Sequence, residues 1–326
     1  MRNSDAFIVI AKKEYADAVK NVLFLTLVSF LLGLVGISLL VAAFNFQSQV
    51  AQYNQALEQI KQSGLTGAML EEPQYYPLQM LRGTVEYLEI IGAIIGIILG
   101  YLAIAKEKGA NTARLLLSRP LGGVSFVGGK IFGNSLLILS VLGIIFLFII
   151  VSISGIGHVL FSQLELLKLF LAFLFSFIYL VFFFCFAMLL TLFFRSMPHA
   201  LIVAFSVWLV FVLIIPQIGD TMDPDNQVPG GFFNSMHMTQ DQQKRVIAKF
   251  KRYENFRNAM EESSVEKHYE RLVFATLGIK DMYNDKGLSF IFKDKWGDLV
   301  WVIGYCIMGA ILSFALFKNG RLLNSP

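Results

Sequence analysis

Residues 169–194 of the chain are LFLAFLFSFIYLVFFFCFAMLLTLFF, without a charged side chain between Lys168 and Arg195. A helix needs roughly 20 apolar residues to cross the hydrocarbon core of a bilayer. This stretch is therefore long enough to span a membrane. The composition agrees, because 56% of the 326 residues are hydrophobic and 15% are charged, against about 45–50% and about 25% in soluble domains. These values exclude a disordered chain and argue against an ordinary soluble enzyme.

Five other stretches have the same character. Together the six predicted spans cover residues 22–44, 87–105, 131–154, 169–194, 199–215 and 298–317. The sequence therefore predicts an all-α polytopic membrane protein with six transmembrane helices. Residues 1–21 are expected to form an amphipathic helix before the first span, and residues 318–326 a short tail. Cys185 and Cys306 both lie inside apolar runs, so we expect no disulfide.

Lys and Arg beside the spans predict the orientation, because cytoplasmic flanks carry an excess of these residues. If the N-terminus is cytoplasmic, twelve basic residues lie in the inner flanks, and the short outer loops hold only Lys61, Arg82 and Lys168. Both termini are therefore expected in the cytoplasm, with the chain crossing the plasma membrane several times. Residues 45–86, 155–168 and 216–297 then lie outside.

The outer segment 216–297 is expected to form a small helical extracytoplasmic region. It carries twelve basic and twelve acidic residues, and residues 220–231 are rich in Asp, Pro and Gly, which is typical of a loop. Residues 239–277 lack Pro and Gly, and their apolar side chains recur every three or four residues, which predicts helix. Residues 46–62 of the first outer loop are predicted to form a short amphipathic helix.

Several kinds of chemistry are absent from the sequence. Residues 122–130 (GGVSFVGGK) differ from a phosphate-binding loop, because the pattern requires Gly where Val124 stands and Ser or Thr where Ile131 stands. We therefore expect no nucleotide site, cofactor or catalytic residue in this chain. The four histidines are scattered, so no metal site is expected. The net charge of +4 lies mostly beside hydrophobic segments and indicates no nucleic-acid partner.

The predicted cytoplasmic loop 106–130 begins with KEKGANTARLLLSRP. Leu115, Leu116 and Leu117 form an apolar cluster between charged residues. An exposed apolar patch rimmed by charge marks a contact site. The alternative is a helix that lies in the lipid interface.

This loop resembles that of the type-2 ABC exporter permeases, the ABC-2 family. The family pattern is roughly an acidic residue, any residue and Gly-Thr, then Leu-Leu-Ser-x-Pro, then Gly-Lys at the start of the third helix. The chain matches it with Glu107 and Gly109, with residues 116–120, and with Gly129 and Lys130, while Ala110 stands where Thr is usual. Residues 11–17 (AKKEYAD) are similar to the amphipathic N-terminal helix of the family.

The resemblance implies that the chain is the membrane-spanning subunit of an ATP-binding cassette (ABC) exporter. The loop would be a coupling helix, seated in a groove of a separate ATPase subunit that binds ATP and Mg. Two ATPase copies would act on this chain paired with a second copy or with a homologous chain. The residues implied in ATPase coupling are Glu107, Gly109, Arg114, Leu115, Leu116, Leu117, Ser118, Arg119 and Pro120. Lys13, Glu14 and Asp17 of the N-terminal helix would add a second contact, although membrane anchoring explains this helix equally well.

Gly92, Gly96 and Gly100 form a stripe with four-residue spacing, which lets another helix approach closely. We expect packing within the chain, with a subunit seam as the alternative.

Two other functions stay open. A permease-like subunit could transmit ATP-driven motion to an extracytoplasmic protein through the outer region. A polytopic membrane enzyme would need polar residues that converge at the membrane edge. The acidic residues available for that are Glu86, Glu89, Asp220, Asp223, Asp225 and Asp298. The uncharged spans suit a lipid, a hydrophobic peptide, a drug or a glycan carrier as substrate.

Overall fold

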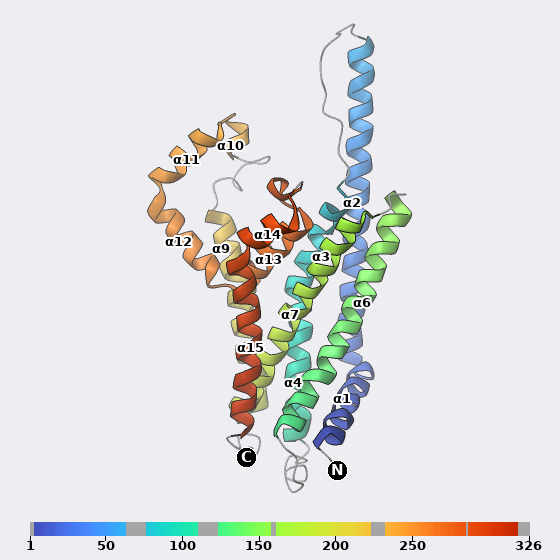
Figure 1. The fold of residues 1–326 in the computed structure, drawn as a ribbon, viewed down its shortest axis with the longest axis vertical. Helices are drawn as coiled ribbons and strands as arrows, with labels where there is room; N and C mark the ends of the chain where they lie inside the picture. Colours follow the sequence, from blue (N-terminus) through green and yellow to red (C-terminus); the bar gives the residue numbers. More distant parts are fainter. Residues whose placement is uncertain are drawn as a thin grey trace.

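The computed structural model describes residues 3–62, 76–109, 123–157, 161–222, 232–284 and 286–318. Within these ranges helices joined by short turns make up the chain, and there is no strand (Figure 1). Six helices are long and apolar enough to cross a membrane: Val22–Ile60, Pro77–Lys108, Ser125–Gly155, Gln163–Phe193, Met197–Met222 and Trp296–Lys318. The prediction of an all-α polytopic membrane protein is confirmed.

The N-terminal helix α1 (Asn3–Val19) precedes the first span, α2 (Val22–Gln62). Helix α2 does not end at Phe44 as predicted, so residues 46–62 continue the span instead of forming a separate short helix. The reason is that these residues contain neither Gly nor Pro, the two residue types that interrupt helices most strongly. The end of α2 projects beyond the other helices as a stalk (Figure 1).

The second and third spans each contain a π-helical turn. The second runs through η1 (Pro77–Leu81), α3 (Arg82–Tyr87), the π-helical turn η2 (Leu88–Gly92) and α4 (Ala93–Gly109). The third consists of the π-helical turn η3 (Val124–Gly128) and α6 (Gly129–Gly157). Both spans are longer than predicted, so helices take up both ends of the predicted loop 106–130. Residues 110–122 lie outside the described residues.

The fourth span, α7 (Gln163–Phe193), starts six residues before the predicted Leu169, because Ser162 and Glu165 form a capping box there. The fifth span joins α8 (Met197–Trp208), the π-helical turn η4 (Leu209–Ile214) and α9 (Ile215–Met222). It continues through Pro216, beyond the predicted end at residue 215, because the π-helical turn precedes the position where proline disturbs the helix. The sixth span is α15 (Trp296–Lys318).

Helix α7 lies at the centre of the bundle, packed against α4, α15, α8 and α6. Its largest buried side chains include Tyr179, Phe184 and Leu180. Gly96 and Gly100 face α7 so closely that a Cβ at Gly100 would overlap the carbonyl oxygen of Phe184. The glycine stripe therefore lies at the contact between α4 and α7.

The outer region between the fifth and sixth spans is helical, but residues 239–277 form three helices in place of one. Breaks at Phe250 and Ser263–Ser264 separate them. The elements of this region are α10 (Phe232–Ser235), α11 (Gln240–Lys249), α12 (Lys251–Glu262), α13 (Val265–Leu277), η6 (Asp281–Tyr283) and α14 (Leu288–Asp294). Helices α10 to α12 curve away from the bundle, whereas α13 packs on α7 and α15 (Figure 1).

Candidate functional site

Helix α1, the last turn of α4 and the first turn of α6 meet at one end of the bundle, which we call the α1 end (Figure 1). The described chain stops at Gly109 and resumes at Gly123, so both flanks of the predicted coupling segment start from this end. The contacts at the end of α4 and at the start of α6 would determine how a force on residues 110–122 reaches the membrane spans.

A buried group of charges joins the three elements at the α1 end. Lys130, at the start of α6, has a side chain that is 1% exposed and forms an ion pair with Glu14 of α1. Its Nζ also lies 3.4 Å from Oε1 of Glu107 in α4. Nζ of Lys13 donates to the same Glu107 oxygen over 3.1 Å. We call Lys13, Glu14, Glu107 and Lys130 the lysine–glutamate network.

The network contains two acids and two bases, so its formal charges balance. Removing one partner of a buried ion pair leaves an uncompensated charge and costs about 3–5 kcal/mol. Burial alone would lower the pKa of Lys13, but its hydrogen bond to Glu107 and the charges of Glu107, Glu14 and Asp17 raise that pKa above its ordinary value. The network therefore favours one arrangement of α1, α4 and α6.

Close backbone packing accompanies these charges. A Cβ at Gly133 of α6 would overlap the carbonyl oxygen of Ala11 in α1, and one at Gly129 would crowd Ile10. The Gly-Lys pair at residues 129–130 thus has two roles: the glycine allows α1 to approach, and the lysine binds Glu14 of α1. On the other side, Phe126 of η3 stacks on Phe317 of α15, with ring centroids 4.9 Å apart.

Lys108 makes a contact that the sequence analysis did not identify. Its buried Nζ donates to the carbonyl oxygens of Thr191 over 2.7 Å and Phe194 over 2.9 Å. These groups belong to the C-terminal end of α7, where carbonyls lack helical partners and the helix dipole favours a cation. Lys108 therefore joins the end of α4 to the end of α7. A lysine whose partners are distant main-chain carbonyls leaves no pattern in the sequence.

The residues predicted to contact the ATPase lie in different environments. Glu14 and Glu107 are buried in the lysine–glutamate network. The side chain of Lys13 is 55% exposed, and Asp17, 39% exposed, lies 3.8 Å from Lys106. Gly109 is the last residue of α4. The remaining predicted residues lie outside the described part of the chain: Arg114, Leu115, Leu116, Leu117, Ser118, Arg119 and Pro120.

The exposed residues of α1 include apolar side chains, with Ile8 and Val9 about half exposed, and the lysines Lys12 and Lys13. A helix that exposes apolar side chains and lysines suits the membrane interface. Membrane anchoring and contact with a partner are thus both available to α1.

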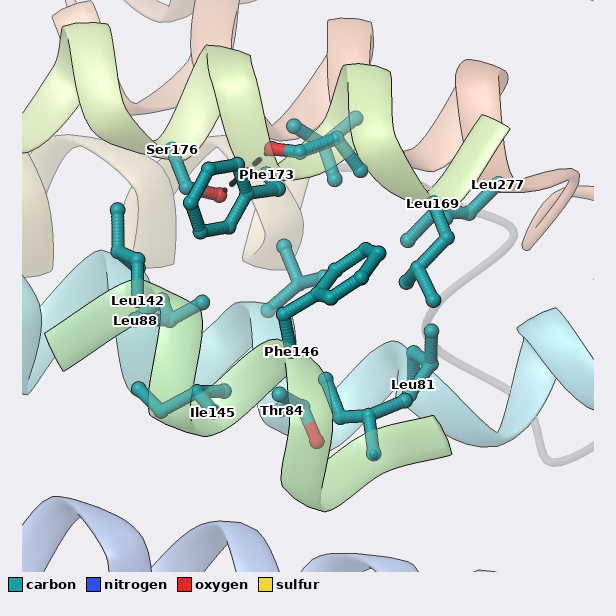
Figure 2. A pocket seen from close by; sticks show the side chains of 14 residues that line it. Leu81, Thr84, Leu88, Leu142, Ile145, Phe146, Leu169, Phe173, Ser176 and Leu277 are labelled. Carbon is teal, nitrogen blue, oxygen red and sulfur yellow. Dashed lines mark hydrogen bonds between the residues drawn. The ribbon is translucent and has the colours of Figure 1, made fainter. Parts of the chain in front are cut away.

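A small cavity lies between α3, α6, α7 and α13 (Figure 2). Its volume is about 40 Å³, and leucine, isoleucine and phenylalanine side chains make up most of its lining. Thr84 and Ser176 are the polar residues in the lining, and the buried Thr84 Oγ1 has no hydrogen-bond partner among the described residues. The cavity is large enough for water but too small for a typical ligand of about 300–1,000 Å³.

The acidic residues at the opposite end of the bundle fall into separate contacts. Glu86 pairs with Arg82, Asp220 with Lys267, and Asp298 with His268. Asp223 and Asp225 lie outside the described residues. Among the residues that are described, no group of three or more His, Cys, Asp or Glu side chains could hold a metal ion.

A sequence-family model described as "ABC-2 family transporter protein" matches residues 8–322 of the chain. The match extends over almost the whole chain and includes all six spans. It confirms the resemblance indicated by residues 106–130. A comparison with curated proteins found no match.

Proposed function

Because this chain belongs to the ABC-2 family of transporter proteins, and is thus a membrane-spanning subunit of an ABC transporter, we propose that it couples ATP hydrolysis in a separate ATPase subunit to substrate export. The observation that carries this proposal is the lysine–glutamate network. It joins α4 and α6, the two helices from which residues 110–122 emerge, to each other and to α1.

Transmission of a force needs a stiff connection between the place where the force acts and the helices that move. On the α4 side, Lys108 binds the end of α7 one residue before the described chain stops. On the α6 side, Lys130 binds α1. A displacement of residues 110–122 would therefore move α1, α4, α6 and the end of α7 together. This movement would shift the equilibrium between two arrangements of the bundle.

We propose different roles for the residues on either side of this segment and within it. Leu115, Leu116 and Leu117 would fill the ATPase groove, with Arg114 and Arg119 at its polar rim. Glu107 and Glu14 are buried and paired, so we propose that they position the segment without touching the ATPase. Lys13 and Asp17, which are partly exposed, keep the proposed second contact.

The proposed assembly holds two ATPase subunits, which bind ATP and Mg, and two permease subunits. The basic residues beside the spans support cytoplasmic termini and a plasma-membrane location. In this orientation the α1 end faces the cytoplasm, where an ATPase can reach it.

The double substitution Leu116→Asp and Leu117→Asp tests the proposal. We expect the variant to insert normally but to lose both ATPase co-purification and substrate-stimulated ATP hydrolysis. Met282→Asp is the matched control, because Met282 is an apolar residue of η6 that is 62% exposed at the other end of the molecule. Retention of both properties by the double variant would disprove the coupling assignment.

A second function, transmission of motion to an extracytoplasmic protein, is favoured by the outer helices. Phe250, Tyr253 and Phe256 are each 46–60% exposed there. Phe250 and Tyr253 also line a groove of about 530 Å³ formed by α9 to α12. Exposed apolar surface of this kind marks an interaction site. If this function holds, Phe250→Asp and Phe256→Asp should release a co-purifying outer protein but retain the ATPase; release of neither would reject it.

A further inference from the structure

Helix α13 buries charged residues between the membrane spans. Eleven of its 13 residues are buried, and its first turn contains Glu266, Lys267 and His268, each less than 7% exposed. Buried charges are rare in proteins unless they have partners. The contacts of these three side chains therefore show what holds α13 in place.

The two basic residues already have partners. Nζ of Lys267 lies 3.1 Å from Asp220 of α9 and 2.6 Å from Glu270. The ring of His268 lies 2.7 Å from Asp298 of α15 through Nδ1, and 2.9 Å from the carbonyl oxygen of Glu262 through Nε2. Neither forms an ion pair with Glu266.

Two buried acidic residues, Glu266 and Glu89, do not form such ion pairs. Glu89 lies in the π-helical turn η2 of the second span, and both residues are 5% exposed. Oε1 of Glu89 and Oε2 of Glu266 have no hydrogen-bond partner among the described residues. Tyr179 connects the two sites, because it contacts the main chain of Glu89 and the ring of Tyr269, three residues after Glu266. Two neighbouring elements thus each bury a carboxyl group with an oxygen that lacks a partner among the described residues.

The surrounding structure fixes α13 against two π-helical turns. Tyr179 of α7 donates a hydrogen bond of 2.9 Å to the carbonyl oxygen of Glu89. The ring of Tyr179 stacks on Tyr269 of α13, with centroids 4.3 Å apart. The side chain of Ser264, the N-cap residue of α13, donates a hydrogen bond to the carbonyl oxygen of Phe211 in η4. A π-helical turn interrupts the regular helical hydrogen bonds. A carbonyl oxygen of η2 therefore accepts from Tyr179, and one of η4 accepts from Ser264.

An ionised carboxylate that is buried without a partner is costly, and two such carboxylates on neighbouring elements add to that cost. Neither Glu89 nor Glu266 lines either of the two cavities described above, and a proton needs no cavity. We propose that Glu89 and Glu266 form a proton-binding site in which at least one of the two carboxyl groups is protonated, so that α13 packs against the second span without burying two carboxylate charges.

The electrostatics of Glu266 support this assignment. Burial raises the pKa of Glu266 to about 8, with Lys267 opposing the shift and Glu270 and Asp220 adding to it. Other titratable or charged groups on α13 and on the elements packed against α13 and η2 include Tyr269, Arg271, Arg82, Glu86, Tyr87, Glu165, Lys168, Tyr179, Lys251, Arg252, Tyr253, Glu254, Arg257, Glu261, Glu262, Tyr283, Lys293, Asp294 and the His268–Asp298 pair. The inference does not depend on the proposed coupling to an ATPase.

Infrared spectroscopy of the full-length chain in lipid nanodiscs tests the site. We expect a C=O stretch from a buried protonated carboxyl at about pH 6, which weakens as the pH rises through about 8. Glu89→Gln and Glu266→Gln should each reduce this signal. Glu58→Gln, at an exposed position on the stalk of α2, should leave it unchanged.

The thermal midpoint provides a second readout. Because burial raises the pKa of Glu266 above its value of about 4.3 in the unfolded chain, stability should fall from about pH 4 to about pH 8 and then level off. In Glu266→Gln the thermal midpoint should decrease less between about pH 4 and about pH 8 than in the wild type, because residue 266 no longer titrates. If neither variant changes the infrared signal at about pH 6, or if the signal is absent in the wild type, the proposal is overturned. A carboxylate signal that responds to sodium instead of pH would also reject it.

Discussion

Lys130 at the start of α6 and Glu14 in α1 form an ion pair whose side chains are 1% and 6% exposed. The two residues lie 116 positions apart in the sequence, and the pair joins the helix that precedes the first span to the helix that starts the third. Glu107 of α4 lies beside the same lysine. A charge pair so well buried specifies how these helices are arranged at the place where we propose that an ATPase acts.

Lys130→Met should destabilise the chain by about 3–5 kcal/mol, because Glu14 is left buried without its partner. Adding Glu14→Gln should recover part of the loss, since the uncompensated charge is removed. Thermal unfolding in detergent measures both effects. Lys106→Met is the control, because its pair with Asp17 is partly exposed and contributes about 0–1 kcal/mol. Equal losses in Lys130→Met and Lys106→Met would contradict the role of the buried pair.

Lys108→Met should remove the cation that binds the end of α7. Leaving buried carbonyl groups without a donor costs about 1–3 kcal/mol. We also expect lower substrate-stimulated ATP hydrolysis, with the ATPase still bound, because α4 loses its connection to α7. Lys12→Met, an exposed change on α1, provides the comparison. A Lys108→Met variant with normal stability and normal stimulation would show that this contact is dispensable.

Gly100→Ala should cost about 1–3 kcal/mol, because its Cβ would overlap the backbone of α7 and force the helices apart. Gly143→Ala in α6 is matched to it, since no atom lies within 4 Å of a Cβ there. Alanine raises helix propensity equally at both sites, so the difference in thermal midpoint isolates the packing. If Gly100→Ala and Gly143→Ala had equal thermal midpoints, α4 and α7 would not be in close contact.

Single cysteines test the orientation. In a chain without Cys185 and Cys306, a cysteine at Asn226 should react with a membrane-impermeant thiol reagent added to intact cells. A cysteine at Asn111 should react only after the membrane is opened. The reverse pattern would place the α1 end outside and reject the proposed coupling.

Much of the fold could be predicted from the sequence, because long uncharged apolar stretches indicate membrane spans without any knowledge of tertiary contacts. Uncharged stretches such as residues 169–194 predict a membrane span wherever they occur. The lengths of the helices were less predictable. Helix α2 continues to Gln62 and the fifth span continues through Pro216, since neither a polar sequence nor a proline next to a π-helical turn ends a helix.

The polar contacts could be predicted only in part. The Gly-Lys pattern at residues 129–130 drew attention to Lys130, but its pairing with Glu14 depends on how α1 packs. The contact of Lys108 with α7 was missed for the same reason. The burial of Glu89 was not predicted either. The long-range packing of α7 and α13, which decides its burial, leaves no periodic signal in the sequence.

The most direct test of the central claim is photo-crosslinking from residue 116. A photoreactive amino acid replaces Leu116 in the full chain, and one in place of Phe256 provides the comparison on the outer side. After illumination in cells, we predict that residue 116 links to a protein with the nucleotide-binding motifs of an ABC ATPase, and that residue 256 does not. Links from residue 116 to lipid alone would contradict the account and favour a helix that lies in the membrane interface.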